Sequence, residues 1–209
     1  MNTEPSIPLA EFLRPKNVGD IIGQDHLLGD GQSLKVAITS GNLPSMILWG
    51  PPGVGKTTIA RVIANSTDAQ FISISAVLSG VKEIRESIEK AKFSLEQQNK
   101  KTILFIDEVH RFNKGQQDAF LPHIESGLIT LIGATTENPS FEVNTALLSR
   151  CQIYVLKILS IDELNTIIDK VINKFDKIKI DNKAKDIILT YANGDDRRLK
   201  ILLEMLINC

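Results

Sequence analysis

Residues Met46 to Ala60 read MILWGPPGVGKTTIA, and this stretch decides the fold. It begins with an apolar run, Ile47 to Trp49, of the kind that forms a short buried strand. The eight residues from Gly50 to Thr57 match the pattern G-x-x-x-x-G-K-[ST], and apolar residues return at helical spacing from Ile59 onward. A strand, a glycine-rich loop and a helix in this order are the context that a phosphate-binding loop requires, so the sequence predicts one here.

The residue types in this loop suit phosphate chemistry. Its glycines allow a tight turn and aim backbone N–H groups at phosphate oxygens. The helix that follows begins at Lys56, so its positive end faces the same anion. The Lys56 ammonium can reach the β- and γ-phosphates, and the Thr57 hydroxyl is a ligand for Mg²⁺. The sequence therefore predicts a nucleotide site whose loop contacts are Gly50, Pro51, Pro52, Gly53, Val54, Gly55, Lys56, Thr57 and Thr58.

Length, charge and cysteine content bound the class of protein. The chain has 209 residues and a formal net charge of −1 at pH 7. That length suits one domain with a smaller appendage, and that charge produces no global field favouring nucleic acid, although a local patch stays open. Cys151 and Cys209 have no metal-ligand spacing to a histidine, and no stretch is long and apolar enough to span a bilayer. We expect a cytoplasmic protein with no membrane partner.

Strands and helices are expected to alternate as far as residue 159. The hydrophobic pattern predicts strands at 70–75, 101–107, 128–134 and 152–156, and helices at 33–40, 81–98, 115–126 and 144–150. On the helix at 81–98, the expected buried face carries Ile84, Ile88, Ala91 and Leu95. This alternation favours an α/β fold in which helices cover both faces of a parallel sheet.

Beyond residue 159 the pattern becomes entirely helical. Helices are expected at 161–175, 182–191 and 195–208, and Ser160 with Glu163 makes a capping box for the first. We expect an α/β domain over residues 1–159, with a frayed tail at 1–8, and a small helical lid over 160–209. Basic and acidic residues alternate between 170 and 185, which is typical of a solvated face rather than a DNA track.

Two acids follow the apolar run at residues 103–106. In an open parallel sheet, ligands bind at the carboxyl edge of the strands, where Asp107 and Glu108 are expected to lie. Asp107 would then hold Mg²⁺ through water, and Glu108 would orient and polarise the water that attacks the γ-phosphate. The alternative is a solvated acidic turn, and the phosphate-binding loop favours the functional interpretation.

Several other residues, near the ends of predicted strands or helices, can each be interpreted in two ways. Thr136 either faces the γ-phosphate or, with Asn138, bonds local backbone. Arg150 either reaches a neighbouring subunit's nucleotide or is an ordinary surface arginine. One of Arg197 and Arg198, at the start of the last helix, either reaches a phosphate from the lid side or is likewise a surface arginine, and spacing alone favours the surface interpretation for each. His110 has no second ligand at metal-binding spacing, and the loop that it begins is either solvated or, through Arg111 and Lys114, a DNA contact.

Taken together, the motifs resemble those of a known family. Their order along the chain is that of the AAA+ ATPases: Gly50–Thr57, Asp107-Glu108, Thr135-Thr136, LLSRC and GDDRR. Residues 107–151, DEVHRFNKGQQDAFLPHIESGLITLIGATTENPSFEVNTALLSRC, closely resemble the replication-associated recombination protein A family. The similarity runs from about Leu9 to the C-terminal residue. It implies a P-loop AAA+ parallel-sheet domain followed by a small all-helical lid.

The resemblance also implies a role for each matched residue. Arg14 and Ile22 belong to the segment that covers adenine. By the same resemblance, Lys56 and Thr57 bind phosphate and Mg²⁺, Asp107 is the Mg²⁺ acid and Glu108 is the catalytic base. Thr136 is implied to be sensor 1. Arg150 is implied to be an arginine finger that acts in trans, and Arg197 to be sensor 2, which acts in cis. The charges of DRRLK at 196–200 exceed those usual in the family and are expected to modify the sensor 2 contact.

A function follows from the same resemblance. It implies an ATP- and Mg²⁺-dependent factor acting at stalled replication forks in the nucleoid, with forked or gapped DNA, single-stranded DNA-binding protein and further copies of itself as partners. Family members are about twice as long and carry a C-terminal oligomerisation domain absent from these 209 residues. That difference leaves open a monomer that acts as a nucleotide-gated binding module with negligible turnover. A clamp-loader or branch-migration subunit is the third alternative, which the stretches HRFNK and TTENPSF disfavour.

Overall fold

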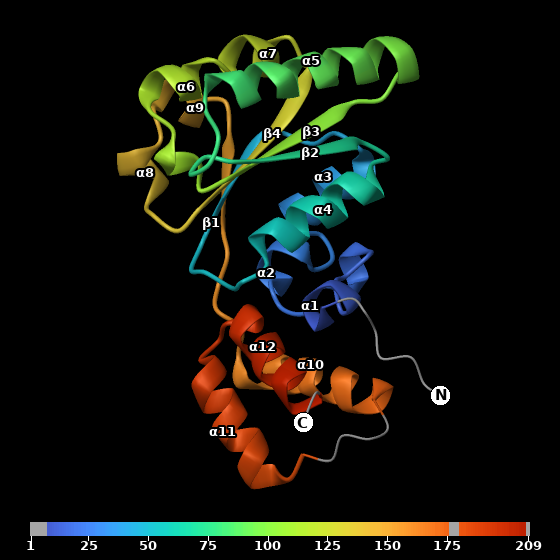
Figure 1. The fold of residues 1–209 in the computed structure, drawn as a ribbon. Helices are drawn as coiled ribbons and strands as arrows, with labels where there is room; N and C mark the ends of the chain where they lie inside the picture. The colour runs from blue at the N-terminus through green and yellow to red at the C-terminus, as the bar shows by residue number, and fades with distance from the viewer. Residues whose placement is uncertain (1–7, 176–179, 208–209) are drawn as a thin grey trace.

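A computed structural model describes residues 8–175 and 180–207 of the chain. In Figure 1 a sheet lies between two sets of helices, and a separate group of helices lies below it. The frayed tail predicted at residues 1–8 falls outside the described residues except for Pro8, as does residue 208 of the last predicted helix.

The sheet has five strands, all parallel, in the order β2-β3-β4-β1-β5. The strands are β1 (Met46–Trp49), β2 (Gln70–Ser75), β3 (Thr102–Asp107), β4 (Ile129–Thr135) and β5 (Gln152–Val155). Each of the predicted strands is present within one or two residues of its expected ends. The expectation of an α/β fold built on a parallel sheet is therefore confirmed.

Successive residues of the inner strands belong to two different cores, because successive side chains of a strand point to opposite faces of the sheet. In β1, Met46 and Leu48 join the core beneath α3 (Ser33–Ser40) and α4 (Lys56–Ser66). Ile47 between them joins the core on the opposite face, beneath α5 (Val81–Gln98). Because both faces are covered, the middle of β3, residues 103–106, is apolar throughout instead of alternating with polar residues.

Short helices fill most of the connections. They are α1 (Leu9–Phe12), η1 (Val18–Asp20), α2 (Asp25–Leu28), η2 (Val109–Arg111), α6 (Lys114–Asp118), α7 (Leu121–Glu125), α8 (Pro139–Glu142) and α9 (Thr145–Leu148). The single helix predicted at 115–126 was wrong, since α6 and α7 are separate. Pro122 lies in the first turn of α7, where its missing N–H is harmless, whereas inside a continuous helix it would remove one hydrogen bond.

The buried face of α5 was predicted with one error. Ile84, Ile88 and Ala91 are buried as expected, but Leu95 is 40% exposed and Ser94 is buried in its place. The helix has 18 residues and spans about 27 Å, whereas the six-residue strands beneath it span about 20 Å, so its last turn overhangs the sheet. Across the described ranges of the chain, no helix has both the length and the apolar character that crossing a membrane demands.

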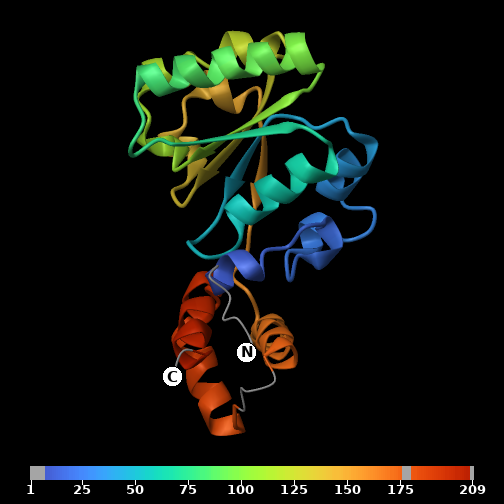
Figure 2. The ribbon, with the colours of Figure 1, turned by 45° about the vertical axis from the view of Figure 1, so that its right-hand side comes forward.

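The helical group after the sheet consists of α10 (Ile161–Lys174), α11 (Asn182–Ala192) and α12 (Asp196–Ile207). The capping box is confirmed, because the Ser160 and Glu163 side chains each accept a hydrogen bond from the other's backbone N–H. These helices share a core of their own, in which Leu164, Ile168 and Leu203 are buried. Leu9 of α1 joins this core, and Figures 1 and 2 both show α1 beside α12. The first described helix thus packs against the last one.

Candidate active site

The register of the sheet brings three predicted motifs to one edge. Trp49 at the end of β1 pairs with Thr135 at the end of β4, and Ile106 of β3 pairs with Gly133 of β4. The phosphate-binding loop, the acids after β3 and the threonines after β4 all follow from these ends. Since parallel strands end together, the motifs meet at the carboxyl edge of the sheet, where such folds bind ligands.

The loop that leaves β1 has the shape of an anion cradle. Gly53 and Gly55 adopt left-handed backbone conformations, with φ of 73° and 95°, and α4 begins at the next residue, Lys56. The Lys56 ammonium is buried and donates to the carbonyl oxygens of Gly50 at 2.7 Å and Pro51 at 2.8 Å. Burial lowers the pKa of Lys56, an effect that the nearby Glu108 carboxylate partly offsets. An incoming polyphosphate would add to the counter-charge that Glu108 supplies to this ammonium.

Glu108 lies at the same edge in an unusual conformation. Its backbone is left-handed, with φ of 54°, a state that non-glycine residues rarely adopt and that recurs at functional sites. One carboxylate oxygen, Oε2, lies 3.3 Å from His110 Nδ1 and 3.5 Å from the hydroxyl oxygen of Thr136. The carboxylate is thus positioned from two sides and remains half-buried next to the loop.

His110 does not lie in the solvated loop that was one of the two interpretations. Its side chain is only 6% exposed, and Nδ1 lies 2.9 Å from the Thr135 hydroxyl oxygen. The ring packs there because Val109 and Phe112 on either side are buried in the core beneath α5. The neighbouring Arg111 and Lys114 are exposed, which both interpretations of these two residues allow.

Thr135, the last residue of β4, and Thr136, which follows it, make different contacts. Thr135 is buried and bonds locally: its hydroxyl oxygen accepts from the Glu137 N–H at 3.1 Å. Asn138 caps α8 by accepting from the Ser140 N–H at 3.0 Å. Thr136 is only half-buried and faces Glu108 instead of a backbone group. The geometry therefore favours Thr136 as the residue that faces the reacting phosphate.

The lid closes this edge from the other side. The backbone N–H of Asp196, the first residue of α12, donates to the Gly53 carbonyl at 3.1 Å. The Asp195 carboxylate accepts from the N–H groups of Arg197 and Arg198 and so caps the helix. One cavity is lined jointly by the loop, the acids and the lid: Ala10, Arg14, Pro52, Gly53, Gly55, Lys56, Thr57, Thr58, Asp107, Glu108, Asp196, Arg197 and Lys200.

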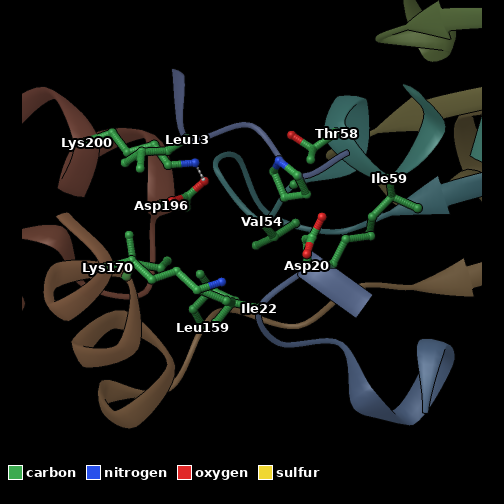
Figure 3. A pocket seen from close by; sticks show the side chains of 14 residues that line it. Leu13, Asp20, Ile22, Val54, Thr58, Ile59, Leu159, Lys170, Asp196 and Lys200 are labelled. Carbon is green, nitrogen blue, oxygen red and sulfur yellow. Dashed lines mark hydrogen bonds and ion pairs between the residues drawn. The ribbon is translucent and has the colours of Figure 1, made fainter. Parts of the chain in front are cut away.

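A second, more apolar pocket adjoins that cavity (Figure 3). Its apolar walls come from the N-terminal segment, the loop helix and the lid: Leu13, Pro15, Ile21, Ile22, Val54, Ile59, Leu159 and Ile167. A purine base suits such walls. Ile22, which was predicted to contact adenine, lines this pocket. Arg14, which was predicted to belong to the same adenine-covering segment, lines the cavity beside Lys56 and not this pocket.

Comparison with known proteins identifies the family. A model of the "ATPase family associated with various cellular activities (AAA)" matches residues 46–159, which is more than half of the chain. The chain belongs to the AAA family. Replication-associated recombination protein A of Escherichia coli K12 is 53% identical over 205 residues, which cover 95% of this chain and 46% of that protein. ATPase WRNIP1 of Dictyostelium discoideum is 47% identical over 96% of this chain and 23% of its own length.

The fold of this AAA chain also matches solved structures. The Holliday junction branch migration motor RuvB of Thermotoga maritima matches with a TM-score of 0.75 and 31% sequence identity, over 93% of this chain and 64% of that one. The chain spans about half the length of the bacterial curated relatives that it matches. The resemblance to the replication-associated recombination protein A family is confirmed over this span.

Arg150 lies at the opposite edge of the AAA sheet. It precedes β5, whose first residue, Gln152, pairs with Met46 at the start of β1, whereas the phosphate-binding loop follows the other end of β1. The two ends of β1, Met46 and Trp49, are three residues or about 10 Å apart, and the loops beyond the strand ends add to this distance. The Arg150 guanidinium is partly exposed and pairs with Glu125 of α7. It does not line the cavity that contains Lys56.

The residues present suit a magnesium ion bound together with nucleotide. Thr57 and Asp107 line the same cavity as Lys56 and offer a hydroxyl and a carboxylate. Mg²⁺ is usually held by one or two side chains together with substrate phosphates and water, so these two donors fit its chemistry. No group of three or more metal-ligating side chains occurs in the part of the chain that the structure describes.

His110 and Asp195 were not predicted as parts of this AAA site, and Asp196 and Lys200 were expected only to modify the contact of Arg197. Their residue types gave little signal, because polar and charged residues in loops and on the outer turns of helices are usually solvated. Cys151, in contrast, adds no chemistry. Burial raises the pKa of its thiol to about 12, so it stays protonated at neutral pH.

We expect Gly53→Ala to weaken ATP binding about tenfold, because the lid lies against this glycine. A Cβ at residue 53 would lie 1.7 Å from Asp195 Oδ1, so either the Asp195 carboxylate would have to give up its cap of α12 or the lid would have to move. Gly41→Ala is the matched control, because Gly41 has a similar φ of 70° but a Cβ there meets nothing within 4 Å. Fluorescence titration with ATP measures both affinities. Equal affinities for the two variants would show that lid contact at residue 53 has no part in binding.

Proposed function

We propose that this chain is the ATP-hydrolysing module of a DNA replication and recombination factor. One observation carries the proposal: Lys56, Thr57, Asp107, Glu108 and Arg197, which come from three separate segments, line one cavity between sheet and lid. A chain without nucleotide chemistry has no physical reason to collect these groups around a buried ammonium. Membership of the AAA family supports the same assignment.

Binding would begin with the phosphates on the loop. The N–H groups of residues 53–57 and the positive end of α4 attract them, and Lys56 exchanges the carbonyls of Gly50 and Pro51 for phosphate oxygens. Adenine occupies the apolar pocket beside Ile22. Thr57 and Asp107 would hold Mg²⁺, whose chemistry is to neutralise charge on the phosphates. Arg197 approaches the phosphates from the lid.

Hydrolysis depends on Glu108. Its carboxylate accepts a proton from a water molecule as that water attacks the γ-phosphorus, and the bond to the ADP oxygen breaks. Thr136 and His110 keep the carboxylate in place at 3.5 Å and 3.3 Å. A carboxylate oriented in this way spends no free energy on reorganisation when the reaction occurs.

Arg150 would complete a neighbouring site. It cannot serve its own site, because it lies at the far edge of the sheet. Its partial exposure leaves the guanidinium available to the nucleotide of a second copy, where it would stabilise charge in the transition state. The functional form proposed is therefore a homo-oligomer.

The DNA-related part of the proposal is supported by the names of relatives. The bacterial proteins at 48–53% identity are replication-associated recombination proteins. We propose that the protein acts in the cytoplasm, on the nucleoid, at stalled forks, with forked or gapped DNA and single-stranded DNA-binding protein as partners. A branch-migration motor is a second candidate, favoured by the likeness to RuvB, but its 31% identity is well below the 53% of the first relative.

ATP turnover by this chain, measured against protein concentration with and without forked DNA, tests the proposal. Turnover per chain that rises with concentration, and again with DNA, supports an oligomeric DNA-stimulated ATPase. Flat, near-zero turnover despite measurable ATP binding contradicts hydrolysis by this chain alone and favours a nucleotide-gated binding module. Faster migration of a four-way junction than of a fork-regression substrate would favour the motor instead.

Mixing two inactive variants is expected to restore turnover if Arg150 acts in trans. Arg150→Ala removes the finger, and Glu108→Gln removes the base, so each variant alone should lose about 100-fold or more of the activity. In mixed oligomers, an intact Glu108 site of one chain faces an intact Arg150 of the other. Equimolar mixing should recover about a quarter of wild-type turnover. A mixture as inactive as its components would show that Arg150 does not serve a neighbour.

A further inference from the structure

The two hollows of the cleft share part of their lining. The apolar pocket and the loop cavity have four residues in common: Gly55, Thr58, Asp196 and Lys200. The first two belong to the loop and α4, and the last two to the start of α12. These four therefore mark the junction between the two hollows.

The covalent order of a nucleotide decides what lies at that junction. With the base in the apolar pocket and the β- and γ-phosphates on the loop, the ribose and α-phosphate must bridge the two. Asp196 and Lys200 consequently face the middle of the nucleotide. Arg197, in contrast, lines only the loop cavity.

Asp196 and Lys200 form a partly buried ion pair at this junction (Figure 3). Lys200 Nζ lies 2.6 Å from Asp196 Oδ2, and the two side chains are 11% and 20% exposed. The second oxygen, Asp196 Oδ1, is buried and has no hydrogen-bond partner within the described residues. A buried carboxylate with one unpaired oxygen is poorly compensated for its lost hydration. Lys200 therefore compensates this carboxylate, and only a stronger anion such as a polyphosphate would draw the lysine away.

We propose that Lys200 is a nucleotide-binding residue that Asp196 holds in reserve. When ATP enters, the ammonium leaves Asp196 and pairs with the α-phosphate, whose oxygens accept strongly from a lysine. The backbone N–H of Asp196 donates to the Gly53 carbonyl, which fixes Asp196 beside the loop. From this position its carboxylate competes with the nucleotide for Lys200 and repels the phosphates. The inference rests on the proposed ATP site.

This arrangement predicts opposite effects from the two halves of one ion pair. Lys200→Met removes the nucleotide contact and should weaken binding of ATP and ADP alike about tenfold, because both carry the α-phosphate. Adenosine, which has none, should bind both proteins equally. Asp196→Asn removes the competitor and should tighten ATP binding about threefold. A merely structural pair would give weaker binding in both variants.

Isothermal titration of the chain with ATP, ADP and adenosine measures these affinities. Lys185→Met is the matched control, because Lys185 pairs with Asp169 at 2.9 Å elsewhere on the lid and should leave all three affinities unchanged. Weaker ATP binding by Asp196→Asn, or wild-type affinity in Lys200→Met, would overturn the inference. Wild-type protein that binds no nucleotide would instead remove the proposed function.

Discussion

Glu108→Gln is expected to stop ATP turnover while leaving ATP binding intact. Glutamine has nearly the same shape and can keep contacts with Thr136 and His110, but it cannot accept a proton from water. General-base catalysis by a positioned carboxylate contributes about 10²–10⁴-fold, so turnover should fall by that factor. Phosphate release under saturating ATP measures the first quantity, and equilibrium titration the second.

Glu137→Gln is the control for this substitution. Glu137 is exposed and follows the same strand end as Thr136, so the exchange alters a neighbouring acid without touching the cavity. It should retain wild-type turnover. If Glu108→Gln turned over ATP at the wild-type rate, Glu108 would not be the base.

Lys56→Ala is expected to abolish measurable ATP binding, with a loss of about 100-fold in affinity. The ammonium is buried beside the loop and lacks a paired carboxylate within hydrogen-bond distance in this structure, since it donates only to the carbonyls of Gly50 and Pro51. Burial lowers the pKa of Lys56, because desolvation disfavours the charged ammonium. The substitution to alanine therefore removes a buried charge whose desolvation costs free energy. The thermal unfolding midpoint should therefore stay within about 4 °C of wild type.

Lys82→Ala provides the comparison, because the Lys82 side chain is 82% exposed and does not line the cavity that contains Lys56. Its ATP affinity and unfolding midpoint should match those of the wild type. Retained ATP binding by Lys56→Ala would mean that nucleotide binds elsewhere.

Much of the fold could be predicted because its signals are local. The loop motif fixes a strand before residue 50 and a helix after residue 56, and the apolar runs at β3 and β4 indicate buried parallel strands. The errors also have local causes. Pro122 divided one predicted helix, and the length of α5 beyond its strands exposed Leu95.

The site was harder to predict where distant segments meet. Nothing near Asp195 and Asp196 in the sequence reveals that they pack against Gly53, more than 140 residues earlier. The contact of His110 with Thr135 likewise depends on the neighbouring positions of β3 and β4. Arg150 shows the reverse case: the resemblance assigns it to a neighbouring chain's site, and the strand register adds only that it lies at the edge of the sheet away from its own phosphate-binding loop.

The position of bound ATP tests the account most directly. A crystal structure of Glu108→Gln with ATP and Mg²⁺ should place adenine beside Ile22 and Leu159, and the phosphates on residues 53–57. The Lys56 ammonium should have left the carbonyls of Gly50 and Pro51 for the phosphate oxygens. ATP bound away from this cleft, or phosphates outside the reach of Lys56, would contradict the account.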